Sequence, residues 1–145
     1  MAKILVTENI VGQAMDQLRS QFNVVFEPTA WKNADQLQLL IGDVKAVIVR
    51  NQTEVTAELI AAAANLKVIG RAGAGLDNVD VTAATEAGVV VTYAPCENSL
   101  SVAELTVGLM ISLARNIPAA AADTRQAGWN RGQFTGSELS GKTLG

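Results

Sequence analysis

The sequence contains no histidine among its 145 residues and only one cysteine, Cys96. Without histidine, Ser-His-Asp and Cys-His nucleophilic sites are excluded, as are the usual zinc sites. A single cysteine excludes an internal disulfide and is typical of a reducing compartment, so we expect a cytoplasmic protein. Because no histidine is present to activate Cys96 as a nucleophile, we expect it to be a small packing residue. We predict no metal site.

Positive charge is also scarce. The formal net charge is −3 and no run of basic residues occurs, so we expect no nucleic-acid partner. The most apolar run, Leu105 to Ala114, is too short to cross a bilayer, and the N-terminal residues lack the layout of a signal peptide, so we expect no membrane partner. Hydrophobic residues make up 49% of the chain, which excludes a disordered protein and supports a domain with a substantial core.

A glycine-rich stretch at residues 66–80 is the centre of the sequence. Its first part, Leu66 to Ile69, has the apolar composition of a buried parallel strand. Three glycines then interrupt the strand, and Asp80 can cap a helix over Val81 to Ala87. The glycines are Gly70, Gly73 and Gly75. A strand that opens into a helix in this way leaves backbone N–H groups free, and such groups attract anions.

This stretch is not a dinucleotide fingerprint, because Asn78 stands where that pattern needs glycine or alanine. Two arginines near it, Arg50 and Arg71, favour a site for a small acidic metabolite. A plain tight turn remains the alternative for the loop, and surface ion pairs remain the alternative for the two arginines.

Strands and helices alternate along the first part of the chain. The predicted strands are residues 3–7, 23–26, 45–49, 66–69 and 89–92, and the predicted helices are 11–22, a segment ending at Gly42, 57–64 and 81–87. This alternation predicts an α/β fold with a doubly wound, five-stranded parallel sheet in the order 2-1-3-4-5. Thr7, Arg50, Arg71 and Pro95 follow strands, so we expect them at the carboxyl edge, where such sheets bind ligands.

The chain changes character after Pro95. Ser101 and Glu104 have the spacing of a capping box, which predicts the start of a helix. This helix is apolar on most faces, so we expect a second domain or subunit to cover it, and we expect Pro118 to end it. From Ala119 onward, Trp129 and Phe134 lie among glycines and polar residues, and we interpret this segment as an arm on a partner subunit.

Five motifs follow one another over the whole chain. They are residues 49–53, 70–80, 98–104, 113–118 and the pair 128–129 with 141–145. Together they resemble the D-isomer-specific 2-hydroxyacid dehydrogenases, and within that family the branch of the D-3-phosphoglycerate dehydrogenases of serine biosynthesis. The resemblance implies an incomplete flavodoxin-like substrate domain at 1–97, a linking helix at 98–118 and a dimerisation arm at 119–145.

The resemblance also implies what this chain does not contain. In the family, Gly-Lys-Thr-Leu-Gly leads into the NAD-binding domain, which carries the catalytic Arg, Glu and His, and C-terminal helices return to complete the substrate domain. We therefore expect an N-terminal segment with no catalytic residue of its own, inactive alone, that binds no NAD tightly and forms a homodimer.

The resemblance gives roles to single residues. The backbone of Ala72 and Gly73 would hold the carboxylate of a small anionic 2-hydroxy or 2-oxo acid. Arg50, Asn51 and Arg71 would meet its carboxylate or phosphate end, because a planar guanidinium matches an oxyanion.

Ala74 and Asn98 would line the mouth shared with NAD, and Ser101 and Glu104 would begin the hinge helix. Two positions depart from the phosphoglycerate branch: Asn51 stands where serine is usual, and Cys96-Glu97 replaces a pair similar to Asn-Gly.

Other folds of this class fit less well. A receiver domain needs an acidic pair after the first strand and an aspartate after the third, where this chain has Thr7-Glu8 and Arg50-Asn51. A flavodoxin needs a loop rich in glycine and hydroxyl groups after the first strand, and residues 6–9 do not provide one. The remaining alternative is a self-associating module with only generic anion binding.

Overall fold

The computed structural model describes residues 2–145, and the chain divides into two compact units, the first up to Glu97 and the second from Asn98 to Gly145. The first unit is an α/β domain and the second is helical. Each unit is described separately below.

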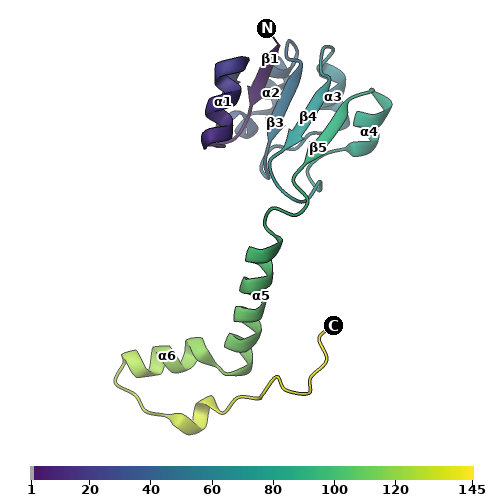
Figure 1. The fold of residues 1–145 in the computed structure, drawn as a ribbon. Coiled ribbons are helices and arrows are strands. Elements are labelled where there is room, and N and C mark those ends of the chain that lie inside the picture. The colour runs from purple at the N-terminus through teal and green to yellow at the C-terminus, as the bar shows by residue number, and fades with distance from the viewer. Residues whose placement is uncertain (1) are drawn as a thin grey trace. The chain divides into compact units, whose positions relative to one another are not determined.

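A five-stranded parallel sheet forms the centre of the first unit (Figure 1). Its strands are β1 (Lys3–Val6), β2 (Asn23–Phe26), β3 (Ala46–Val49), β4 (Val68–Arg71) and β5 (Val90–Tyr93). Their order in the sheet is β2-β1-β3-β4-β5, which confirms the prediction. This order is compatible with the right-handed crossovers that parallel strands joined by helices require.

β4 differs most from its predicted position, by two residues, whereas the other strands agree with their predicted bounds to within one residue. β4 begins at Val68 rather than Leu66, because the Leu66 amide donates to the carbonyl of Ala63 and so belongs to the turn after the preceding helix. Gly70 therefore lies within the strand, and the glycine loop begins after Arg71.

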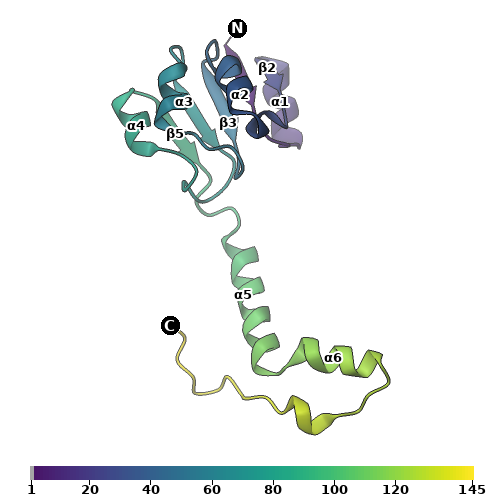
Figure 2. The same cartoon turned by 180° about the vertical axis from the view of Figure 1, so that it is seen from behind.

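The helices lie on both faces of the sheet. They are α1 (Gln13–Gln21), α2 (Ala34–Ile41), α3 (Ala57–Ala62) and α4 (Val81–Glu86), with a short 3-10 helix, η1 (Ala30–Lys32). Figures 1 and 2 show α2, α3 and α4 on one face and α1 on the other. Thr56 and Asp80 cap α3 and α4 as predicted, since their side chains accept from the amides of Leu59 at 3.3 Å and Ala83 at 2.8 Å.

The hydrophobic core lies between the sheet and helices α2 to α4. Strand residues that point to this face are fully buried, and residues of α2 and α3 pack on them. They include Leu5, Val47, Val49 and Ile69 from the strands and Leu37, Ile41, Leu59 and Ile60 from the helices. The alternation of buried and half-buried residues along β3 follows from the two-residue period of a strand.

The opposite face of β3 to β5 is different. Ile48, Gly70 and Thr92 lie side by side on it, and in the described part of the first unit no helix covers them (Figure 1). Val90, on the same face, is 62% exposed. This unit therefore has one packed face and one face that is apolar and only partly covered.

The second unit contains α5 (Ser99–Ala114), α6 (Ile117–Arg125) and a 3-10 helix, η2 (Arg131–Phe134). The capping-box prediction is wrong. α5 begins at Ser99 with Asn98 as N-cap, no side chain caps it, and Ser101 and Glu104 lie inside its first turns, because helical bonding already starts between the Asn98 carbonyl and the Val102 amide.

Pro118 does not end this helix. α5 ends at Ala114, Asn116 adopts a left-handed backbone with φ 54°, and Pro118 lies in the first turn of α6. Proline is favoured there because its missing N–H group has no partner in a first turn. The predicted boundary between residues 118 and 119 thus lies inside a helix that the sequence analysis did not anticipate.

Neither helix of this unit has a buried residue. Among residues 2–145, no single helix is long and apolar enough to cross a membrane. The pair α5 and α6 reaches the required length and composition only when taken together, and it is bent by 65°.

A valine-to-threonine substitution should change the free energy of unfolding differently on the two faces of the sheet. Val47→Thr places a hydroxyl at a site with 0% exposure and should lower the free energy of unfolding by about 2 kcal/mol. Val90→Thr, at 62% exposure, should change it by less than about 0.5 kcal/mol. Urea unfolding followed by circular dichroism measures both. An equal loss in the two variants would contradict the assignment of faces.

Candidate functional site

The carboxyl edge of the sheet brings the predicted site residues of the first unit together. Thr7 directly follows β1, Arg50 follows β3 and Arg71 ends β4, while Pro95 lies two residues beyond β5. β1, β3 and β4 are neighbours in the sheet, so their carboxyl ends lie next to one another. Two loops form this part of the edge, residues 50–53 after β3 and residues 72–78 after β4.

Loop 50–53 is built around the carboxylate of Glu8. Oε1 accepts from the amides of Arg50 at 2.7 Å and Thr53 at 3.1 Å, and Oε2 accepts from those of Asn51 at 3.2 Å and Gln52 at 3.1 Å. Four consecutive N–H groups that converge in this way form an anion-binding nest. Glu8 is only 3% exposed, so the protein fills this nest with its own side chain.

The side chain of Asn78 binds two carbonyl groups of the same loop. The Nδ2 atom donates to the carbonyl of Thr53 at 2.7 Å and to that of Arg50 at 3.1 Å. The Thr53 and Thr7 hydroxyls lie 2.7 Å apart and complete the buried polar network. Glu8 and Asn78 were not predicted as site residues. The one available signal was an acidic residue two positions after β1, but the sequence alone does not show that this residue is buried.

Arg71 folds back over the glycine loop. Its side chain is 11% exposed, and Nη2 lies 4.0 Å from Oδ1 of Asp77. A Cβ atom at Gly73 would clash with Nη1 of Arg71, so only glycine permits this close approach. Among the described residues Nε of Arg71 has no hydrogen-bond partner although it is buried. A ligand oxygen would supply the acceptor that this donor lacks.

The amides of the glycine loop fall into two groups. The Ala72 amide donates to the carbonyl of Val49 at 2.8 Å, and the Gly73 amide to that of Arg71 at 2.9 Å. For the next three amides, at residues 74–76, no acceptor is recorded among residues 2–145. The donors free for an anion are therefore at Ala74 and beyond, while the assignment of the substrate carboxylate to Ala72 and Gly73 stays a prediction.

Most of the other predicted residues are exposed. The side chains of Arg50 and Asn51 are exposed although their amides are bound by Glu8. The remaining predicted residues belong to the second unit, where all are exposed except Phe134, which is half-buried. They are Asn98, Ser101, Glu104, Trp129 and Phe134.

Cys96 is exposed, so the prediction that it is a packing residue is wrong. It follows β5 between Pro95 and Glu97, which are exposed as well.

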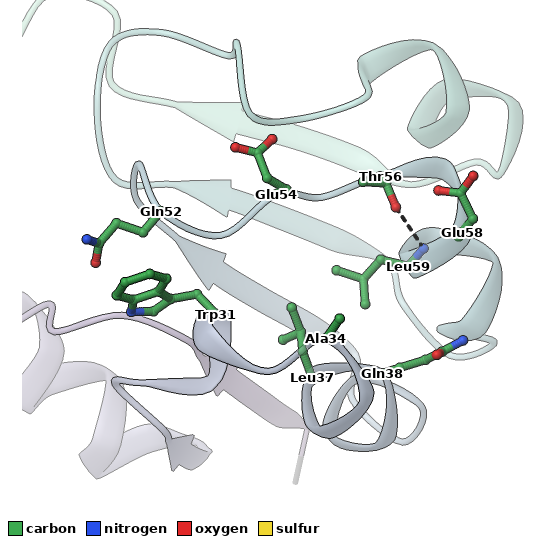
Figure 3. Close-up of a pocket in the computed structure, with 9 residues that line it drawn as sticks. All are labelled: Trp31, Ala34, Leu37, Gln38, Gln52, Glu54, Thr56, Glu58 and Leu59. Atoms are coloured by element: carbon green, nitrogen blue, oxygen red, sulfur yellow. Dashed lines mark hydrogen bonds between the residues drawn. The ribbon is translucent and has the colours of Figure 1, made fainter.

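A cleft of about 340 Å³ lies next to loop 50–53, which contributes Gln52, between η1 with α2 and the segment that leads into α3 (Figure 3). Its apolar walls include Trp31, Leu37 and Leu59, and the carboxylates of Glu54 and Glu58 lie on its rim (Figure 3). None of the predicted site residues lines it. No cationic residue lines it and its rim is acidic, which disfavours an anionic ligand, so we assign the candidate site to the two loops.

Glu8 carries the one buried charge of this site. Burial alone would raise its pKa, but hydrogen bonds from the amides of Arg50, Thr53 and Asn51 and from the Thr53 hydroxyl hold the pKa of Glu8 below its ordinary value of 4.5. Since the folded state binds the proton less tightly than the unfolded chain, ionised Glu8 stabilises the fold above this value. The contribution is lost as the pH falls through the folded-state pKa.

Glu8→Gln should lower the free energy of unfolding by about 3 kcal/mol near neutral pH, because an amide side chain leaves backbone donors unpaired. Below the folded-state pKa the difference from the unmodified protein should shrink, since Glu8 is then protonated. Urea unfolding near neutral pH and at a pH below the folded-state pKa of Glu8 measures this difference in stability. The control is Glu27→Gln, a half-buried glutamate after β2. A pH-independent difference would contradict the prediction.

Comparisons with known proteins agree with this fold. The model of the family "D-isomer specific 2-hydroxyacid dehydrogenase, catalytic domain" matches residues 4–140. The chain is 48% identical over its entire length to D-3-phosphoglycerate dehydrogenase of Methanocaldococcus jannaschii, of which it covers 27%. It is 51% identical over 111 residues to the enzyme of the same name from Rattus norvegicus, covering 77% of this chain and 21% of the relative.

Solved structures give the same result. A protein of Pyrococcus horikoshii OT3 superposes with a TM-score of 0.82 at 32% identity, over 98% of this chain and 44% of the other. The NAD+-bound 3-phosphoglycerate dehydrogenase of Entamoeba histolytica gives 0.67 at 34% identity, over 79% and 39%. The chain spans about a quarter of the length of the curated relatives it matches. It belongs to the D-isomer specific 2-hydroxyacid dehydrogenase family, in the region of the catalytic domain.

Proposed function

We propose that this chain is the substrate-binding part of an NAD-dependent D-2-hydroxyacid dehydrogenase that oxidises 3-phosphoglycerate at C2 in serine biosynthesis, in the cytoplasm. The observation that carries the proposal is the 48% identity over the whole chain to a D-3-phosphoglycerate dehydrogenase. A structurally similar protein is described as an NAD+-bound 3-phosphoglycerate dehydrogenase, which supports the cofactor.

The glycine loop receives the acid in this proposal. The free amides of residues 74–76 favour binding of a carboxylate, because backbone donors without partners bind anions well. Arg71 adds a guanidinium whose buried Nε lacks an acceptor. Arg50 and Asn51, on the neighbouring loop, meet the phosphate end, where a charge-assisted hydrogen bond is stronger than a neutral one.

The residues of this chain do not supply a dinucleotide cradle. At the third position of the fingerprint stands Asn78, which is 4% exposed and holds the carbonyls of loop 50–53 with its side chain. We therefore assign NAD binding to other parts of the longer protein. Ala74 and Asn98 are proposed to face the cofactor only from the substrate side.

This chain binds and orients the substrate but does not supply the base. The sequence has no histidine, so an imidazole that removes the hydroxyl proton at C2 must come from elsewhere in the longer protein. The isolated chain should therefore show no oxidation of 3-phosphoglycerate with NAD above background.

A titration of the labelled chain with 3-phosphoglycerate, followed by NMR, tests the site. We expect shifts at the amides of residues 74–76 and at Arg50 and Arg71. Arg71→Gln should weaken binding at least about tenfold, equivalent to about 1.4 kcal/mol, because one charge-assisted hydrogen bond is lost. Arg125→Gln, which removes an arginine from α6, is the control.

D-lactate and sulfate serve as comparison ligands. Tighter binding of 3-phosphoglycerate than of either supports the phosphoglycerate branch. Equal responses to sulfate and 3-phosphoglycerate would contradict the proposed substrate and leave only a generic anion site.

Self-association is the second candidate function, and α5 favours it. This helix has no buried residue, although its leucines would normally lie in a core. Leu105, Leu109 and Leu113 are exposed by 64%, 61% and 82%. We propose that a second copy covers these side chains, with Trp129 and Phe134 of the following segment in the same interface, which is compatible with substrate binding by the first unit.

Light scattering at micromolar concentration should show a dimer or a larger species. Leu105→Glu should shift the population toward monomer, because a charge replaces buried apolar surface at the interface. Leu39→Glu, the same substitution at an 83% exposed position of α2, should leave the mass unchanged. A monomeric unmodified chain would contradict the dimer.

A further inference from the structure

The carboxylate of Glu8 fills a site that would otherwise bind an external anion. Its two oxygens accept four consecutive amides, from Arg50 to Thr53, at 2.7 to 3.2 Å. No residue among 2–145 forms an ion pair with Glu8. A buried carboxylate without a cationic partner is costly unless hydrogen bonds compensate it. A simpler turn would reverse the chain after β3 without this cost.

Asn78 binds the same loop at both of its ends. The two hydrogens of its amide group reach the carbonyls of Arg50 and Thr53, at 3.1 and 2.7 Å, and Asn78 itself is 4% exposed. Glu8 thus holds the donors of the loop, while Asn78 holds acceptors at its first and last residues. The backbone of Arg50 is fixed from both sides, and its exposed side chain extends from a rigid base.

Asn78 also belongs to the segment that carries the free amides. Its backbone carbonyl accepts from the Val55 amide at 2.8 Å, and the Asp80 amide donates to the Val55 carbonyl at 2.9 Å. The Asn78 side chain therefore joins the loop after β4 to loop 50–53, and backbone hydrogen bonds join the same segment to Val55, two residues beyond that loop. A displacement of one loop would break buried hydrogen bonds to the other.

We propose that Glu8 and Asn78 are positioning residues, which fix loop 50–53 against the glycine loop so that Arg50 and Asn51 are held where an anionic ligand is bound. The inference rests on the proposed function, because it takes the ligand to be the acid bound there. Neither residue touches the ligand; both act through the backbone of the loop. Rigid support of this kind maintains the geometry that a binding site needs.

Electrostatics and positioning predict opposite effects of removing the Glu8 charge. If Glu8 acted only through its charge, Glu8→Gln would strengthen binding of an anion, because a nearby negative charge is removed. If Glu8 acts by positioning, the same variant weakens binding, because Arg50 and Asn51 lose their fixed base.

The experiment measures the Kd of 3-phosphoglycerate by NMR for Glu8→Gln alone and combined with Arg50→Ala. We expect Glu8→Gln to weaken binding at least about tenfold, and to have less than about a twofold further effect once Arg50 is removed, because coupled residues are not additive. Glu27→Gln should stay within about twofold of the unmodified chain. Equal or tighter binding by Glu8→Gln, or full additivity with Arg50→Ala, would overturn the inference.

A second measurement does not depend on ligand binding. Amide hydrogen exchange of Arg50 to Thr53 should accelerate at least about tenfold in Glu8→Gln and less in Glu8→Asp, which keeps a carboxylate on a shorter chain. Amides of the core, such as Ile69, serve as reference and show whether the variants are folded. If the unmodified chain binds no anion, the proposed function fails. Unchanged exchange at Arg50 to Thr53 in Glu8→Gln would overturn the positioning role, independently of ligand binding.

Discussion

The buried carboxylate of Glu8 is the constraint on which the site depends. Four backbone amides after β3 converge on it, and no cation shares the charge among the described residues. The hydrogen bonds have to offset the full cost of taking the carboxylate out of water, so the loop can adopt only the geometry that satisfies them. The anion nest expected at the glycine loop therefore has a counterpart at loop 50–53, which the protein fills itself.

This constraint extends to the neighbouring loop through Asn78. One amide side chain binds two carbonyls of loop 50–53, and its own backbone joins the segment that follows β4. The edge of the sheet consequently has a closed loop, whose four amides are bound by Glu8, and an open loop, at residues 74–76, whose amides have no recorded acceptor among the described residues. The open loop is the part available to a ligand, and Arg71 lies over it with a donor that lacks a partner.

Much of the fold could be predicted because it depends on local patterns. Short apolar runs separated by amphipathic helices allow few parallel arrangements, so the strand order followed directly, and caps such as Asp80 were visible from residue type and spacing. Patterns also misled. Ser101 and Glu104 have capping-box spacing but lie within α5, since a helix begins wherever backbone bonding starts, and Pro118 begins a helix instead of ending one.

The sequence by itself determined the fold class, the order of the strands and the edge at which Arg50 and Arg71 lie, because hydrophobic period and crossover handedness are local or nearly local properties. It also determined that no imidazole is present to act as a base. Only the tertiary structure decided which backbone amides are free and which are bound. Glu8 is 42 residues from Arg50, and Asn78 is 28 residues from it. Such partners meet only after the sheet has assembled, and no spacing rule connects them.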